Sequence, residues 1–344
     1  MSAESYESAV AGPTLARELS PPASLAALHA EVAGWFRPAG LNELLGAATC
    51  PTAHLARQQL ARGHRWRPVL TAVAARCGTD RPAADSVRRA AVAVECMHKA
   101  SLVHDDIADA DETRYAAPTL HRLHGPGVAL NVGDLLIGEG YRLLAEAPWN
   151  VATRVGALRA AAEAHRHLCL GQGAELWSLR TGRPPAPRAV LEAFAGKTAP
   201  AFNLAMQLGA VLSGANAAAR AALGELSEAM GTAYQIRDDL EDLRDEDAWA
   251  QPRRLCATLP LALAVRRANP AQRRVLEALW RADLPAPSGE QVRWLIAATD
   301  AVGRAAQIRR AYAERAAACL ARPELKPIAP LLAQVLRELA DNGA

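Results

Sequence analysis

The sequence predicts an all-α protein, folded as a single large helical bundle around a central cavity. From Ser24 almost to the C-terminus, apolar residues recur at helical spacing, and no segment alternates apolar and polar residues as a half-buried strand does. Hydrophobic residues make up 51% of the 344 residues, enough for a sizeable core. Two long apolar segments each end in the pattern D-D-x-x-D, so we expect two buried helices with acidic ends.

The expected elements follow one another with few long loops. Residues 1–22 show no periodicity, so we expect a disordered tail, followed by one all-α domain over 23–344. Gly63 ends one helix and Pro68 opens the next, positions that these residue types favour. Residues 244–254 are charged and predict a loop. The periodicity predicts helices over 25–36, 41–48, a segment closing at 57–62, 69–76, 84–105, 128–145, 151–179, 188–212, 217–243, 258–268, 270–281, 289–298, 300–320 and 326–341.

The two acidic motifs predict a site for metal ions. Residues four apart share a helix face, so the first and last aspartates of each motif should project together. Several carboxylates around one cavity repel each other unless cations lie between them. Mg²⁺ suits such a site because it takes one or two carboxylates and completes its shell with water and substrate phosphates. A single copy is more often a solvated helix end, but two copies on separate apolar helices favour function. The aspartates are Asp105, Asp106, Asp109, Asp238, Asp239 and Asp242.

Charge and cysteine usage exclude other classes. The net charge is +3, from 39 basic and 36 acidic residues, and no basic stripe with interleaved aromatics indicates nucleic-acid binding. The six cysteines include no C-x-x-C pair, which argues against a zinc site or a disulfide framework and is expected of a cytoplasmic protein. We expect neither a signal peptide nor a transmembrane segment, because the N-terminus is polar and no apolar run is long enough.

Several motifs, in order along about residues 40–340, resemble those of the trans-isoprenyl diphosphate synthases, also called polyprenyl synthetases. The resemblance implies the all-α isoprenoid synthase fold and a homodimer. It also implies three Mg²⁺ ions that hold an allylic prenyl diphosphate between the two aspartate motifs, for condensation with isopentenyl diphosphate. The motifs are G-H-R-W-R-P (Gly63–Pro68), S-L-V-H-D-D-I-A-D (Ser101–Asp109) with Arg114, P-T-x-H (Pro118–His121), N-x-G-D (Asn131–Asp134), G-Q-G-A-E (Gly171–Glu175), G-K-T (Gly196–Thr198), the segment Gln235–Asp242 and T-L-P (Thr258–Pro260).

Ionising an allylic diphosphate separates charge, and the candidate residues match that need. Metal ions and cationic side chains stabilise the leaving diphosphate. We expect Asp105, Asp109 and Asp238 to be the main metal ligands, with Asp106, Asp239 and Asp242 as further or supporting ligands. Arg114 and Lys197 would hold the diphosphate, and Lys197 is one of only three lysines in an arginine-rich chain. Thr198 and Gln235 would turn oxygen dipoles toward the developing cation.

The prenyl tail needs an apolar cavity beneath the aspartates. Met97, Ala100 and Ser101 precede Asp105 on the same predicted helix and are expected to line that cavity. Ser101 lies four residues before Asp105, on the same face, and its small side chain should leave room for chains of about C15–C20 or longer.

The pocket for isopentenyl diphosphate departs from the family pattern. The resemblance assigns it His98 and Arg67, but His64 replaces the family's lysine and Tyr115 replaces an arginine. Drift toward arginine-rich composition does not explain either change. Isopentenyl diphosphate should therefore bind weakly, and better below about pH 6.5, where His64 is protonated. Nearby arginines that could replace the missing cations are Arg65, Arg253 and Arg254.

Three functions stay open on these observations. The first is a chain-elongating prenyl diphosphate synthase. The second is a terpene cyclase, or a prenyltransferase with a different acceptor, because the isopentenyl diphosphate pocket is altered. Aromatic residues make up only 4% of the chain, which weighs against a cyclase that guides cations with aromatic faces. The third is a non-catalytic subunit of a heteromeric synthase, against which the complete aspartate motifs argue.

Overall fold

The computed structural model describes residues 24–244, 249, 252–281 and 286–341, and it is almost entirely helical, as predicted. The predicted tail over 1–22 and most of the predicted loop over 244–254 lie outside the described residues. The helices are α1 (Leu25–Trp35), α2 (Pro38–Leu45), α3 (Pro51–Leu60), α4 (Trp66–Ala74), α5 (Ala84–Ala108), α6 (Leu120–His124), α7 (Pro126–Ala145), α8 (Val151–Arg180), α9 (Pro187–Lys197), α10 (Ala199–Leu212), α11 (Ala217–Asp242), α13 (Leu259–Arg267), α14 (Pro270–Arg281), α15 (Gly289–Ala298), α16 (Ala301–Cys319) and α17 (Ala329–Asp341), with 3₁₀ turns η1 (Pro252–Ala257) and η2 (Pro323–Leu325).

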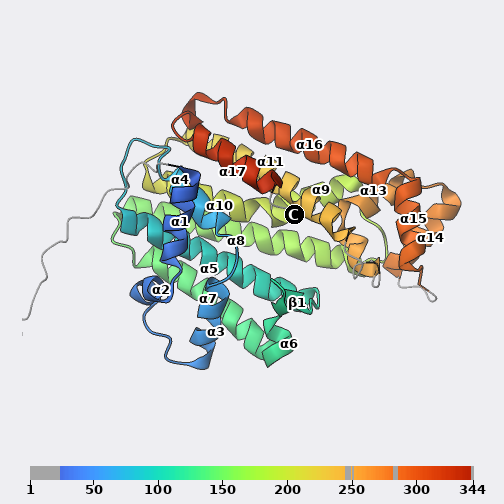
Figure 1. The fold of residues 1–344 in the computed structure, drawn as a ribbon, viewed down its shortest axis with the longest axis horizontal. Helices are drawn as coiled ribbons and strands as arrows, with labels where there is room; N and C mark the ends of the chain where they lie inside the picture. The colour runs from blue at the N-terminus through green and yellow to red at the C-terminus, as the bar shows by residue number, and fades with distance from the viewer. Residues whose placement is uncertain (1–23, 245–248, 250–251, 282–285, 342–344) are drawn as a thin grey trace, which may run out of the picture.

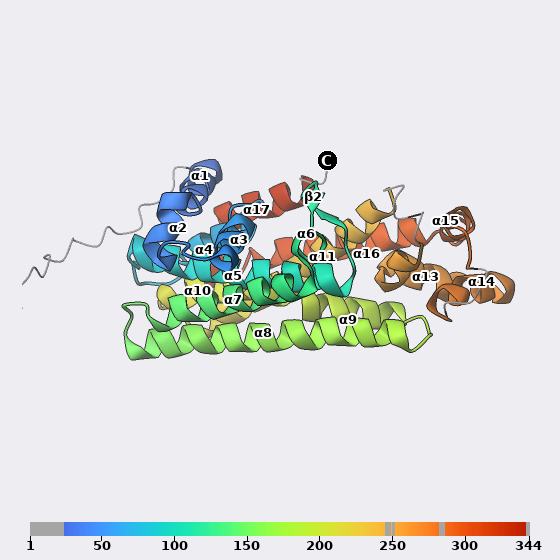
Figure 2. The same cartoon turned by 90° about the horizontal axis from the view of Figure 1, so that it is seen from below.

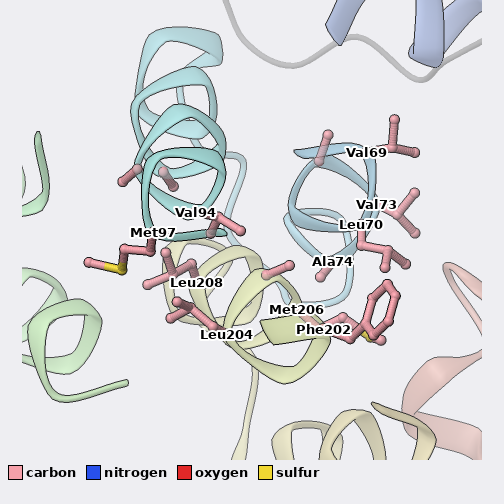
Figure 3. Close-up of a cluster of buried hydrophobic side chains, with 14 of the residues drawn as sticks. Val69, Leu70, Val73, Ala74, Val94, Met97, Phe202, Leu204, Met206 and Leu208 are labelled. Atoms are coloured by element: carbon pink, nitrogen blue, oxygen red, sulfur yellow. The ribbon is translucent and has the colours of Figure 1, made fainter. Parts of the chain in front are cut away.

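Helix α10 lies at the centre of the bundle. It packs against α4, α5, α8 and α11, and it is apolar on most sides, as a buried helix must be. In Figure 3, Leu204 and Leu208 of α10 lie toward Met97 of α5, and Met206 and Phe202 of α10 lie on the side of α4. This central packing holds α5 and α11, the helices that carry the acidic motifs, around one interior space.

A second apolar cluster lies toward one end of the molecule, where α13, α14 and α15 gather (Figure 1). Phe194 of α9 and Ile236 of α11 belong to it and tie the acidic end of α11 to these helices. Helix α8 runs along the length of the bundle (Figure 2). The acidic ends of α5 and α11 are therefore anchored by packing on both sides of the interior space.

The predicted helix over 188–212 is two helices in the structure. Thr198 separates α9 from α10. The cause is Pro200, which cannot donate a helical hydrogen bond and whose ring clashes with the carbonyl of the residue four positions earlier, Gly196. The break places Lys197 and Thr198 at the junction of two helices.

The structure also contains a small hairpin that the sequence did not predict. Strands β1 (Thr113–Arg114) and β2 (Ala117–Pro118) pair antiparallel, and each is only two residues long. Tyr115 and Ala116 form the turn with φ of 53° and 56°, in the left-handed region that non-glycine residues avoid. So short a pairing leaves no periodic pattern in a sequence.

Two further expectations concern the environment. In the described part of the chain, no helix combines the length and apolar character needed to cross a lipid bilayer. All six cysteines are free thiols, so no disulfide framework staples the fold.

Gly209 permits the close contact between α10 and α4, and replacing it should destabilise the protein. A Cβ atom at Gly209 would lie 2.3 Å from the carbonyl oxygen of Thr71 and 2.6 Å from the amide nitrogen of Ala75, both backbone atoms that cannot yield easily. We expect Gly209→Ala to lower the free energy of unfolding by about 1–3 kcal/mol. Gly138→Ala on α7 is the matched control, because nothing lies within 4 Å of its Cβ position, and it should stabilise by about 0.5–1 kcal/mol. Chemical denaturation of both variants tests this expectation, and equal unfolding midpoints for Gly209→Ala and Gly138→Ala would contradict the packing argument.

Candidate active site

Both acidic motifs face one cavity of about 900 Å³. Its walls come from the start of α4, one face of α5, the β1–β2 hairpin, the middle of α8, the α9–α10 junction and the end of α11. A second hollow of about 780 Å³, between α8, α10 and α11, contains no residue of either motif. The larger cavity is therefore the candidate site.

The end of α5 contributes the first pair of carboxylates. Asp105 and Asp109 line the cavity, and Lys197 lies between them and Glu175, donating to Glu175 Oε1 over 3.1 Å. Burial raises the pKa of Asp105 to about 6, with Lys197 lowering it and Asp109 raising it further. Burial likewise raises the pKa of Asp109. The raised pKa values mean that burial disfavours these ionised carboxylates by more than the nearby Lys197 favours them.

The end of α11 contributes the second pair. Asp238 and Asp242 line the cavity, and Arg237 Nη2 donates to Asp238 Oδ1 over 2.8 Å. The same arginine approaches Glu241 Oε1 to 3.2 Å. Burial still raises the pKa of Asp238 to about 6, although the hydrogen bond from Arg237 lowers it. This wall too is poorly solvated for its charge.

The middle aspartates of the two motifs do not line the cavity. Asp106 accepts a hydrogen bond from Arg114, so it positions that arginine. Asp239 is buried and caps the start of α13, accepting from the amide of Leu259 over 2.7 Å. One residue further along a helix turns a side chain about 100° away from its neighbour, which removes Asp239 from the face of Asp238. The position of Asp239 therefore does not support its predicted role as a metal ligand.

The donor set fits divalent cations bound together with a phosphate ligand. Among the described residues, no three His, Cys, Asp or Glu side chains converge closely enough to enclose an ion by themselves. Mg²⁺ seldom uses such a cage and takes one or two carboxylates plus substrate oxygens. Buried, incompletely neutralised carboxylates on two walls of one cavity match that mode of binding.

The helix break at Thr198 positions three predicted residues. Thr198 Oγ1 donates to Gln235 Oε1 over 2.7 Å, and both side chains line the cavity. Gly171 of α8 lets α9 approach closely, because a Cβ there would lie 2.8 Å from the amide nitrogen of Lys197. The break and this close approach together direct Lys197, Thr198 and Gln235 to the same space.

The deeper part of the cavity is largely apolar. Met97 and Ser101 of α5 line it, together with Ile137, Leu168 and Leu204. Ala100, predicted to join them, is fully buried in the main core instead. The reason is helix geometry: five residues before Asp105 corresponds to about 140° around the helix, so Ala100 faces the packed side.

The remaining predicted residues gather at the start of α4. His64, Arg67, His98 and Arg114 all line the cavity. Arg67 Nη1 lies 3.0 Å from His98 Nε2, and burial, then Arg67, lower the pKa of His98 well below its usual range. His98 is therefore a neutral partner for the arginine.

Of the three arginines suggested as replacements for the missing cations, the structure describes the side chain of Arg65, which does not take that role. Arg65 is buried and its Nη1 donates to Glu95 Oε1 over 2.8 Å, while its other hydrogen bonds go to the carbonyls of Leu60 and Arg62. It is held by the fold and is not available as an extra donor. The side chains of Arg253 and Arg254 lie outside the described residues.

Sequence reasoning assigned no role to several residues that line the cavity. Lys99 is the most notable, since it lies on α5 beside the G-H-R-W-R-P segment. The sequence offered a sign of it: Lys99 is one of three lysines in an arginine-rich chain and lies in a largely apolar stretch, residues 90–103. Other lining residues without an assigned role include Gln172, Tyr115, Tyr234, Arg237 and Glu95.

Comparison with known proteins places these features in one family. The family model described as Polyprenyl synthetase matches residues 52–296. A geranylgeranyl diphosphate synthase of Cereibacter sphaeroides is 36% identical over 239 residues, covering 67% of this chain and 75% of that protein. A (2E,6E)-farnesyl diphosphate synthase of Mycobacterium bovis is 34% identical over 228 residues, covering 64% of this chain and 61% of that protein. The crystal structure of a polyprenyl synthase from Caulobacter crescentus CB15, complexed with calcium and isoprenyl diphosphate, is similar with a TM-score of 0.75 at 28% identity, covering 92% of this chain and 98% of that one.

Removing one buried carboxylate should stabilise the metal-free protein. Because the pKa of Asp105 is raised in the folded state, its ionisation costs stability progressively as pH rises from about 4 to about 6. We expect Asp105→Asn, measured in EDTA at pH 7.5, to raise the free energy of unfolding by about 1–2 kcal/mol. The gain should shrink at pH 5, where Asp105 of the wild-type protein is mostly protonated.

Asp134→Asn is the matched control, because the Asp134 side chain is 72% exposed. It should leave the unfolding midpoint nearly unchanged at both pH values. A loss of stability in Asp105→Asn at pH 7.5 would contradict the charge imbalance described for this wall.

Proposed function

We propose that this chain, which belongs to the polyprenyl synthetase family, is a trans-prenyltransferase that ionises an allylic prenyl diphosphate and joins it to isopentenyl diphosphate. The observation that supports it best is a single cavity lined by carboxylates of both motifs and by apolar side chains. The names of the relatives, farnesyl and geranylgeranyl diphosphate synthase, agree with this reaction class.

The leaving diphosphate would lie between the two acidic walls. We infer that Asp105, Asp109, Asp238 and Asp242 hold Mg²⁺, three ions as the family resemblance implies. When bound, such ions neutralise the diphosphate and favour cleavage of the C–O bond. Lys197 would add a hydrogen bond to the same group, because its ammonium lies close to Asp105 and Asp109 and lines the cavity.

Arg114 would also bind the diphosphate. Its guanidinium lines the cavity and is fixed by Asp106 and by Asp111, whose Oδ2 is 3.0 Å from Nη2. A donor whose orientation is fixed before binding loses less entropy when the ligand arrives.

The allylic cation would form next to Thr198 and Gln235. The Thr198–Gln235 hydrogen bond fixes both oxygens in place, and fixed dipoles stabilise charge without reorganising as the reaction proceeds. Below them, the tail would extend along Met97 and Ser101 between aliphatic side chains. The aliphatic side chains along this tail path, Ile137, Leu168 and Leu204, favour chain elongation over a cyclase, which commonly guides its cations with aromatic faces.

We further propose a cytoplasmic homodimer. Exposed apolar side chains on the adjacent helices α7 and α8, among them Leu130 and Val155, could be covered by a second copy. Six free thiols agree with a reducing compartment.

A product assay tests the function. The purified protein is incubated with Mg²⁺ and geranyl or farnesyl diphosphate, with and without isopentenyl diphosphate, and products are identified by mass spectrometry. We expect elongated diphosphates only when isopentenyl diphosphate is present. Asp105→Ala and Asp238→Ala should remain folded and lose product formation, because each removes an inferred metal ligand. Cyclic hydrocarbons, another prenylated acceptor, or near-normal turnover in Asp105→Ala would refute the proposal.

Ser101 should set the length of the chain that fits. Its side chain points along the tail path, with Oγ donating back to the carbonyl of His98 over 2.8 Å. We expect Ser101→Phe to shorten the longest product by at least one five-carbon unit, because a ring would fill that path. Ala100→Ser is the matched control, since Ala100 faces away from the cavity and should leave product length unchanged. Identical product distributions in wild type and Ser101→Phe would show that the tail takes another route.

A further inference from the structure

The pocket beside the start of α4 contains more buried positive charge than its carboxylates balance. Glu95 Oε1 is shared by Arg65 Nη1 at 2.8 Å and Lys99 Nζ at 3.7 Å. The three side chains are between 3% and 6% exposed, so water screens them little. One carboxylate thus serves two cations.

Arg67 adds a third cation to the same pocket. No described carboxylate lies within 4 Å of its guanidinium, which contacts neutral His98 and the ring of Phe202 instead. Its Nε is buried without a hydrogen-bond partner. Buried cations without a matching anion are unfavourable, so this arrangement indicates that an anionic ligand completes the pocket.

The ammonium of Lys99 lies next to the two positions, His64 and Tyr115, at which this chain lacks the family's cations. Its Nζ donates to Tyr115 Oη over 3.1 Å and lies 4.7 Å from the centre of the tyrosine ring. Gly63 lies beside both groups, since a Cβ atom there would come within 2.7 Å of Nζ and 3.2 Å of Tyr115 Oη. The ammonium therefore contacts the hairpin carrying Tyr115 and adjoins the segment carrying His64, the two departures from the family motif.

The two segments that adjoin Lys99, the one before α4 and the β1–β2 hairpin, each contain residues in a costly backbone conformation. Arg65, Tyr115 and Ala116 have φ of 64°, 53° and 56°, in the left-handed region. Such strain persists where surrounding contacts enforce it, commonly at binding sites. Here it directs the Tyr115 phenol onto Lys99.

We propose that Lys99, with the hydroxyl of Tyr115, binds the diphosphate of isopentenyl diphosphate together with Arg67 and replaces the cations missing at His64 and Tyr115. The Tyr115 hydroxyl accepts from Lys99 and keeps its own proton to donate to a phosphate oxygen. This rests on the proposed function and changes one expectation from the sequence: isopentenyl diphosphate binds firmly, and through Lys99 rather than through protonated His64.

The two sources of charge differ in pH dependence. Burial lowers the pKa of Lys99 to about 8; Glu95 raises it, while Arg65, Arg67 and Arg114 lower it. Burial also raises the pKa of Tyr115, so the phenol stays neutral through this range. An anion bound by Lys99 should bind fully below pH 8 and progressively more weakly above it. Binding that depended on a protonated imidazole would instead weaken above about pH 6.5, where a histidine ordinarily loses its charge.

Calorimetric titration of isopentenyl diphosphate into the full-length protein in EDTA tests the proposal. Without metal, the acidic walls repel the diphosphate and binding reports on the cationic pocket. We expect Lys99→Met to weaken binding about 10- to 100-fold, and Tyr115→Phe to weaken it less, since it loses one neutral hydrogen bond. Lys326→Met, which removes an exposed lysine, is the matched control and should bind as the wild type does.

The pH profile gives a second readout that is independent of any folding defect in a variant. Wild-type affinity should fall as pH rises from 7.5 to 9.5, and the fall should be absent in Lys99→Met. Equal affinity of Lys99→Met and wild type, no binding by the wild type, or a midpoint near pH 6.5 would overturn the role of Lys99. Because no turnover is measured, these outcomes are separate from the product assay, whose failure alone would refute the proposed function.

Discussion

The burial of two unbalanced charge clusters in one cavity is the constraint on which the rest of this structure depends. The acidic walls at Asp105 and Asp238 carry carboxyl groups with raised pKa values, because burial disfavours their ionised forms. The pocket around Lys99 has an excess of positive charge instead, and burial lowers the pKa of Lys99. Neither cluster is stable by itself, so the packing of the apolar bundle must supply the free energy that holds them in place. Cations and diphosphates would relieve both clusters.

Local backbone features convert that packing into a defined site. Pro200 breaks a helix so that Lys197 and Thr198 face the cavity, and Gly171 allows the neighbouring helix to approach. The left-handed residues Tyr115 and Ala116 turn the hairpin over the opposite pocket. Except for Gly171, which lies within α8, these features lie on loops and helix ends, whereas the packed middles of α5, α10 and α11 resist displacement. The site thus combines a rigid frame with a few strained positions, a common arrangement where geometry has to be exact for chemistry.

The sequence predicted the fold class well because helical periodicity extends through almost the whole chain. It located Asp105 and Asp109 at the cavity because motif spacing along one helix translates directly into one face, and it located Lys197 and Gln235 there through the family resemblance. It misplaced Ala100, since proximity in sequence to Ser101 does not mean a shared face. The hairpin and the role of Glu95 could not be predicted, because they depend on contacts between segments that no local pattern encodes.

Lys99 shows why a damaged motif need not mean a damaged site. A comparison of motifs counts the cationic side chains at fixed sequence positions. By that count, the pocket near His64 has two cations fewer than the family pattern. A ligand responds to the summed potential of the cavity, whichever element supplies the charge. Helix α5 can supply one because Lys99 lies four residues after Glu95, on the face that meets the G-H-R-W-R-P segment. If α5 supplies the missing charge, the pocket can still bind isopentenyl diphosphate although the G-H-R-W-R-P motif has changed. The departures at His64 and Tyr115 then give no support to a different acceptor.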